Sequence, residues 1–163
     1  MAAFAGPYKQ GIELGLEEAN ASGGVLNKKI EFIFRDDQGK PGEAVKIAEE
    51  LMTRDGAVMI TGTILSHVGL AISSLAGEKG YVYLASEPLA DSIVWAKGNK
   101  YTYRLRTSTF MQAAMLAEEA AKTDAKRFAT IAPNYAYGKD AVAAFKQNLL
   151  KLKPDAEFVA EQW

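Results

Sequence analysis

The stretch Ala57-Val-Met-Ile-Thr-Gly-Thr-Ile-Leu-Ser-His67 has the pattern of a buried strand that runs through a glycine turn into a helix. A second apolar run, Tyr81-Val-Tyr-Leu-Ala85, has the pattern of the next strand. Between the two, apolar residues recur at helical spacing until glycines end the helix, namely Val68, Ala71, Ile72, Leu75 and Ala76 before Gly77 and Gly80. Because parallel strands are joined by crossover helices, this unit predicts an α/β fold with a parallel sheet.

The same alternation extends toward the start of the chain. A helix is expected from Pro7, with Tyr8, Ile12, Leu16 and Ala19 on one face and Gly23-Gly24 as its end. Ile30-Glu-Phe-Ile-Phe-Arg35 is expected to be a strand that leads into the turn residues 36–42, and the next helix begins at Pro41. Since βαβ folds normally begin with a strand, we expect one more strand before Met1.

Toward the end of the chain, residues 86–100 lack a clean period and predict a loop with one short helix. The expected elements beyond it are strand 101–106, helix 109–122, strand 127–132, helix 139–150 and strand 157–162. We place a crossover between two lobes here. Lobe I is expected to cover residues 1–104 and lobe II to begin with residues 105–163.

Composition excludes several classes of function. The 163 residues are 48% hydrophobic and 24% charged, which is typical of a globular protein. Lys+Arg 19 against Asp+Glu 20 gives a net charge of -1, so we expect no nucleic-acid partner. The absence of cysteine and the single histidine, His67, exclude disulfides, thiol nucleophiles and the usual zinc sites. No apolar run is long enough to cross a bilayer.

Sequence motifs of catalysis are also absent. Gly6-Pro-Tyr-Lys-Gln-Gly11 is followed by Ile12-Glu13, not by the Lys and Ser or Thr of a phosphate-binding loop. No GxGxxG follows a predicted strand, and no GxSxG nucleophile elbow occurs. We therefore expect no enzymatic activity, no catalytic residues, no cofactor and no metal site.

Three loops follow predicted strands and should meet at the carboxyl edge of the sheet, where open α/β sheets bind ligands. The residues that they contribute are Ser66 and His67, then Ser86, Glu87 and Pro88, and finally Tyr135 and Tyr137. Ser66 has two readings, since its hydroxyl can cap the following helix or can join the free helix N–H groups in binding an anion. His67 can be a first-turn surface residue, and the tyrosines can be packing. Together the loops favour a small-molecule pocket.

At these loops the sequence resembles the type I periplasmic solute-binding proteins of ABC transporters, in the branched-chain amino-acid branch, also described as the extracellular ligand-binding receptor family. The segments that carry the resemblance are Gly6–Leu14, Glu18–Val25, Asp36 to Val45, Gly62 with Ser66, and Tyr137-Gly138. The resemblance implies a three-layer fold, a parallel sheet with helices on both faces, in two lobes. It also implies an amino acid or related carboxylate held in the cleft between the lobes.

By position, the resemblance assigns roles to individual residues. Ser66 matches the hydroxyl that receives the ligand carboxylate, and Tyr137 matches a tyrosine from the second lobe. Phe4 falls near an aromatic residue of the first loop that covers the ligand side chain. Leu89 stands where a threonine is common in the leucine-type proteins, which argues against a branched-chain amino acid. His67 replaces a small residue, and its imidazole suggests an aromatic acid as the ligand.

The resemblance further implies a fragment, without the first strand of lobe I and without the C-terminal part of the family fold. A sheet without one of its strands exposes unpaired backbone N–H and C=O groups. We therefore expect this sheet to pair with another chain, for example in a homo-oligomer, or to rearrange. The implied partner is the membrane permease of an ABC importer, and the implied location is the periplasm. The alternative that suits 163 residues is a stand-alone flavodoxin-like domain with an enzymatic or signalling role.

Overall fold

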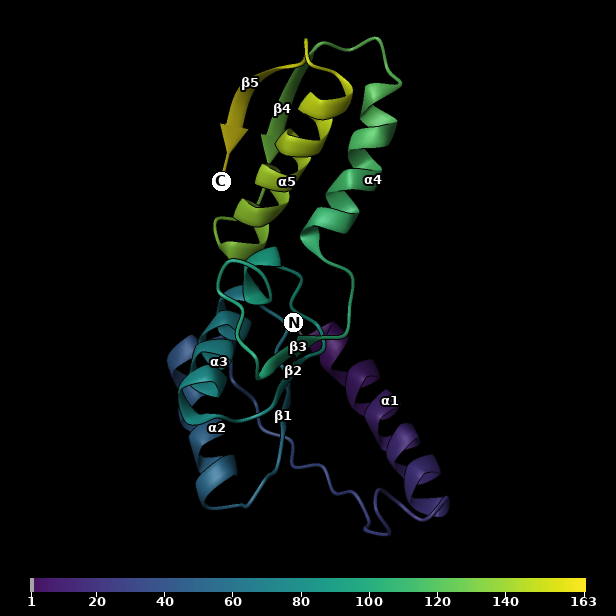
Figure 1. The fold of residues 1–163 in the computed structure, drawn as a ribbon, viewed down its shortest axis with the longest axis vertical. Helices are drawn as coiled ribbons and strands as arrows, with labels where there is room; N and C mark the ends of the chain where they lie inside the picture. Colours follow the sequence, from purple (N-terminus) through teal and green to yellow (C-terminus); the bar gives the residue numbers. More distant parts are fainter. Residues whose placement is uncertain (1) are drawn as a thin grey trace. The chain divides into compact units, whose positions relative to one another are not determined.

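The structure is a computed structural model that describes residues 2–163. It divides into two compact units, one that ends at Arg35 and one from Asp36 to Trp163. Figure 1 shows their elements, with the first unit in purple and dark blue. Among the described residues, no helix combines the length and the apolar character needed to cross a membrane.

The first unit consists of helix α1 (Ala2–Ala21) and an extended segment that returns from it. Asn20 holds that segment, because its side chain donates to the Ile30 carbonyl at 2.9 Å and accepts from the Ile30 N–H at 2.7 Å. The Lys9 ammonium lies 5.2 Å from the ring centroid of Phe34, within cation–π range. Gly23 and Gly24, with φ of 99° and 75°, make the reversal between helix and segment.

Two expectations for this unit are wrong. The helix begins at Ala2, with Pro7 inside it, because alanines precede the proline and favour helix despite the lost proline N–H. Phe4 therefore lies on a helix, with 66% of its surface exposed, and not in a loop. Residues 30–35 are extended but form no strand, since no described strand pairs with them and a strand exists only through its ladder.

The second unit begins with alternating helices and strands. In chain order these are α2 (Pro41–Thr53), β1 (Ile60–Gly62), α3 (Ser66–Lys79), β2 (Tyr83–Ala85), the short 3-10 helix η1 (Asp91–Ile93) and β3 (Thr102–Arg104). The strands are parallel in the order β1-β2-β3, with Tyr83 opposite both Ile60 and Thr102. The strands are shorter than predicted because a ladder lasts only where both neighbours are in register. The short helix expected in 86–100 is confirmed.

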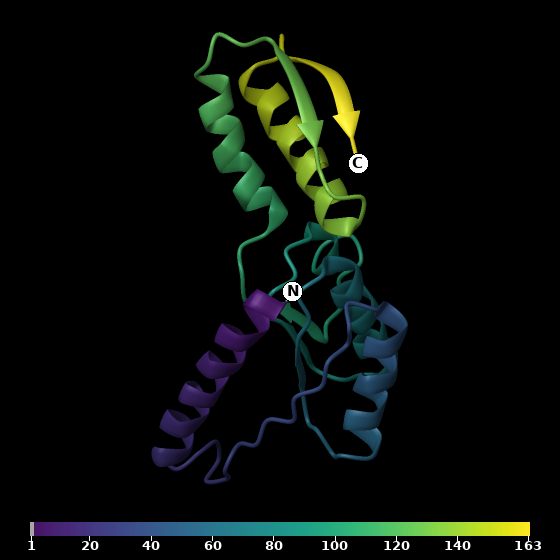
Figure 2. The same ribbon diagram turned by 180° about the vertical axis from the view of Figure 1, so that it is seen from behind.

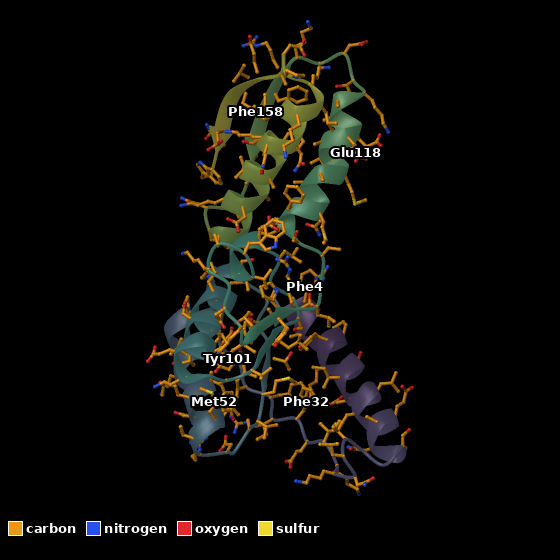
Figure 3. All side chains as sticks on the ribbon, in the orientation of Figure 1. Phe4, Phe32, Met52, Tyr101, Glu118 and Phe158 are labelled. Carbon is orange, nitrogen blue, oxygen red and sulfur yellow. The ribbon has the colours of Figure 1, made fainter. Side chains whose placement is uncertain are left out.

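The rest of the unit contains α4 (Thr109–Ala121), β4 (Arg127–Ile131), α5 (Ala136–Leu152) and β5 (Glu157–Gln162). Strands β4 and β5 are parallel, and α4 and α5 lie side by side next to them in both views (Figures 1 and 2). Their shared core includes Ala117, Leu149 and Phe158, the last labelled in Figure 3. Parallel strands joined by helices confirm the predicted α/β class.

The larger core packs α2 and α3 against the β1-β2-β3 sheet. Its fully buried members include Val68 and Tyr83, and Met52 and Tyr101 pack at its border (Figure 3). Helix α3 ends where the sequence predicts, at Gly80, whose φ of 70° lets its N–H bond the Ala76 carbonyl. The helix face that carries this core is the one predicted from its apolar spacing. The carboxyl ends of β1 and β2 therefore open beside the start of α3.

Candidate functional site

The site lies at the carboxyl ends of β1 and β2 in the second unit. Gly62 ends β1 with φ of 113°, and Thr63 follows at φ 60°, an uncommon value for a residue with a side chain. The Thr63 hydroxyl lies 2.6 Å from the Tyr83 hydroxyl, which also donates to the Gly62 carbonyl at 3.3 Å. These contacts hold the turn that delivers the chain into α3.

Ser66 is the first residue of α3, and the N-cap is Leu65, which has no capping side-chain bond. The reading of Ser66 as a plain helix cap is therefore wrong. Ser66 is buried, with 2% exposure, and its hydroxyl accepts the Ala90 N–H at 3.2 Å. Ser66 thus joins the loop after β1 to the loop after β2. The first N–H groups of α3 have no partner within the helix, as at any helix start, and they favour an anion.

The second loop, Ser86 to Ala90, packs onto α3. Ser86 is 4% exposed, and Pro88 is fully buried. A methyl group added at Gly69 would lie 2.9 Å from the Pro88 Cγ, so the proline ring rests directly on the helix backbone. Only glycine allows this approach, and the two loops consequently form one continuous edge of the site.

Glu87 is not free to point at a ligand as a bare carboxylate. Its Oε2 lies 2.5 Å from the Arg106 Nη1, and Arg106 belongs to the segment that leads out of β3. Arg104 reinforces the same junction, because its Nη1 donates to the Ala90 carbonyl at 3.0 Å. Burial lowers the pKa of the Arg104 guanidinium, against the opposing effect of Asp91. Both arginines tie the second loop to the chain that continues into α4.

An aromatic cluster at the starts of α3 and α5 consists of His67, Tyr135 and Tyr137. The His67 and Tyr135 rings meet edge to face at 5.2 Å, and Tyr135 and Tyr137 lie 6.0 Å apart. The Nδ1 of His67 is buried and has no hydrogen-bond partner within residues 2–163. The pKa of the Tyr135 hydroxyl is raised, mainly by burial and to a smaller extent by the neighbouring Tyr137. The neutral phenol is therefore the form that the cluster favours.

Tyr135 is the N-cap of α5, and Tyr137 is in its first turn. The tight start of this helix depends on Gly138, where a methyl group would lie 2.1 Å from the Pro133 carbonyl oxygen. Seven of the predicted residues therefore lie in the loops and helix starts of the second unit: Ser66, His67, Ser86, Glu87, Pro88, Tyr135 and Tyr137. Phe4 belongs to the first unit, and its role at the ligand stays a prediction.

Sequence reasoning missed the residues that support the loops. Thr63 and Tyr83 form a hydroxyl pair, and Arg104 and Arg106 bind the second loop. The one available signal for these supporting residues was the spacing of Arg104 and Arg106. They lie two positions apart in the predicted strand 101–106, which places them on the same face. Their partners lie 14 and 19 residues away along the chain, which no local pattern indicates.

Comparison with known proteins places the chain in a family. The sequence profile described as "Periplasmic binding protein" matches residues 1–162. The chain belongs to this family of periplasmic solute-binding proteins, which confirms the resemblance found at the loops. The comparisons give no support to the flavodoxin-like alternative.

Particular relatives refine this picture. The chain is 28% identical over 93% of its length to "Leu/Ile/Val-binding protein homolog 3" of Brucella melitensis, of which it covers 41%. A solved branched-chain amino-acid ABC transporter protein of Rhodopseudomonas palustris is 32% identical, with a TM-score of 0.74 over 99% of this chain and 43% of that one. Another R. palustris solute-binding protein, solved with 3,4-dihydroxybenzoic acid, is 27% identical, with a TM-score of 0.79 over 91% of this chain and 40% of that one.

The chain thus spans about 41% of the length of its Brucella relative and 43% of a solved relative. These relatives are binding proteins and transporter components by name. The matched solved structures share the arrangement of helices and parallel strands described above.

Proposed function

We propose that this chain serves in the solute-binding component of an ABC importer and helps to capture a carboxylate, either an amino acid or an aromatic acid. The proposed partner is the importer's membrane permease, and the proposed location is the periplasm. We further propose that residues 1–104 belong to one lobe and residues 105–163 to the other, with the cleft between them. Such a protein captures its ligand when the two lobes close around it, and no covalent bond is formed or broken.

One observation carries the proposal: two loops from neighbouring strand ends are joined at the start of a helix, next to an aromatic cluster. The Ser66–Ala90 bond brings the loops together at 3.2 Å, and the His67–Tyr135 contact adds the rings at 5.2 Å. Free N–H groups at the start of α3 suit the carboxylate end of a ligand. The rings suit its apolar end.

The aromatic cluster favours a benzoate-type acid over an aliphatic amino acid. An added ring can pack edge to face or offset against Tyr135 and Tyr137, which contributes about 0.5 to 1.5 kcal/mol beyond area burial. By the family resemblance, Leu89 also stands where a threonine is common in the leucine-type proteins. A relative that is 27% identical was solved with 3,4-dihydroxybenzoic acid, which agrees with this choice.

Calorimetric titration of the chain tests the proposal, with leucine, benzoate and 3,4-dihydroxybenzoate as ligands. We expect saturable binding of at least one carboxylate and none of benzamide, which keeps the ring and lacks the charge. Saturation by benzamide as tight as by benzoate would remove the anion site from the start of α3. Binding of no carboxylate would refute the proposal for this chain.

The ligand class is tested with Tyr135→Ala. We expect benzoate affinity to fall about twofold to tenfold and leucine affinity to change less, because only the benzoate ring packs on this tyrosine. Tyr103→Ala is the matched control, since Tyr103 is 57% exposed on β3. Equal losses for both ligands in the Tyr135 variant would show that the cluster does not select aromatic acids.

A further inference from the structure

A groove outside the cleft loops lies between η1, α4 and α5. It is open to solvent and has a volume of about 220 Å³. Its lining combines two aromatic rings, two carboxylates and small side chains, drawn from Asp91, Ser92, Trp95, Phe110, Asp140 and Ala144 among others. No lysine or arginine lines it. The groove therefore presents aromatic surface and negative charge together.

The two rings are fixed relative to each other. Trp95 and Phe110 meet edge to face, with centroids 5.6 Å apart, and Trp95 keeps 57% of its surface exposed. The negative faces of aromatic rings attract cations within about 6 Å, and tryptophan does so most strongly.

The carboxylates complete the same surface. Asp140 accepts the Ser92 N–H at 2.9 Å, and no ion pair of the described residues includes Asp140. Asp91 accepts the Thr109 hydroxyl at 2.5 Å through Oδ2, whereas its Oδ1 is buried without a partner in the described part of the chain. The positive charge of Arg104 interacts with the Asp91 carboxylate. The negative charge of Asp140 is therefore the less compensated of the two carboxylate charges. A buried carboxylate oxygen without a partner is costly and is relieved by a nearby cation.

We propose that this groove is a binding site for a small organic cation, an alkylammonium whose methyl or methylene groups contact Trp95 and Phe110 while its charge lies near Asp140. A strongly hydrated inorganic ion gains little from aromatic and alanine surface, whereas an alkylammonium gains from both the rings and the charge. The groove shares no lining residue with the carboxylate-binding loops and their aromatic cluster, although its lining, like the proposed cleft, draws on both proposed lobes.

The probe is tetramethylammonium chloride, titrated at constant ionic strength into the chain that carries Trp163→Phe. Because the chain has 2 tryptophans, this background leaves Trp95 as the sole source of an indole N–H resonance in nitrogen-edited proton NMR. We expect a saturable shift of that resonance with a Kd in the millimolar range. The neutral compound tert-butanol, similar in shape, should give a much smaller and unsaturated shift.

Two variants locate the site. Asp140→Asn keeps an acceptor for the Ser92 N–H and removes the charge, and we expect tetramethylammonium affinity to fall about threefold or more. Phe110→Leu removes a ring and should weaken tetramethylammonium binding about twofold to fivefold. This second variant tests the site independently if Asp140→Asn fails to fold. Asp124→Asn, an exposed carboxylate outside the groove, is the matched control and should leave the titration unchanged.

The proposal is overturned by any of three results. The first is an indole shift that does not saturate with tetramethylammonium. The second is equal binding of tert-butanol, which would make the groove merely apolar. The third is a Kd that folded Asp140→Asn and Phe110→Leu variants leave unchanged, which would place the cation elsewhere on the chain.

Discussion

Replacing Ser66 by alanine removes the acceptor of a buried backbone donor. Ala90 is fully buried, and its N–H reaches the Ser66 Oγ at 3.2 Å. In the variant this N–H has lost its acceptor and remains shielded from water, and an unsatisfied buried donor costs about 1 to 3 kcal/mol. Alanine gains little elsewhere, since Ser66 is the first residue of α3 and does not cap it. The free energy of unfolding should therefore fall by that amount.

For a chain of this size, 1 kcal/mol shifts the melting temperature by about 2 to 4 °C, so Ser66→Ala should melt roughly 2 to 12 °C lower. Thermal melting by circular dichroism, together with urea unfolding at an unchanged slope, measures the effect. Ser74→Ala is the matched control on the same helix, because Ser74 is exposed. That change should stabilise the helix slightly through alanine's higher helix propensity. Equal melting of the Ser66 variant and the parent would refute the assignment of this hydroxyl to Ala90.

Three further predictions follow from the loops. Gly69→Ala should destabilise the chain by about 1 to 3 kcal/mol in urea unfolding, because the new methyl would lie 2.9 Å from the Pro88 ring. Gly138→Ala should cost about 3 kcal/mol or more, since its methyl would lie 2.1 Å from the Pro133 carbonyl oxygen and the start of α5 must move. The pKa of Tyr135 should lie above the usual tyrosine value of 10.0. Above about pH 10 the unfolded chain therefore loses this proton before the folded chain does, and the free energy of unfolding falls as pH rises. Spectrophotometric titration of tyrosinate detects the raised pKa, and Tyr135→Phe should abolish the part of the fall that Tyr135 causes.

Gly42→Ala is the control for both glycine variants. Gly42 lies in the first turn of α2, has ordinary φ and has open space around the added methyl, so the substitution should stabilise the chain by up to about 1 kcal/mol. A loss of stability at Gly42 as large as at Gly69 would mean that contact with Pro88 does not explain the loss at Gly69. For Tyr135, a pKa at or below the usual tyrosine value of 10.0 would contradict the effect of its burial.

Local patterns in the sequence were enough to predict most elements. The apolar spacing from Thr109 predicted helix α4, and Pro41 predicted the first residue of α2. Strand β5 has the predicted bounds, Glu157–Gln162. These elements are predictable because helix periodicity, capping and turn chemistry depend on residues only a few positions apart. The position of the candidate loops followed as well, since parallel strands place their carboxyl ends at one edge of a sheet.

The tertiary structure decided everything that depends on a distant partner. Residues 30–35 have strand composition, yet no described strand pairs with them, because hydrogen-bond ladders join segments that the sequence does not place together. The sequence allowed Ser66 to be a helix cap or an anion-binding donor, and in the fold its hydroxyl accepts the N–H of Ala90, 24 positions away. The Glu87 side chain pairs with Arg106, 19 positions away, while the role of Glu87 at the ligand stays a prediction. A side chain's chemistry is local, but the choice among its possible partners is made only when the chain folds and removes water from some of them.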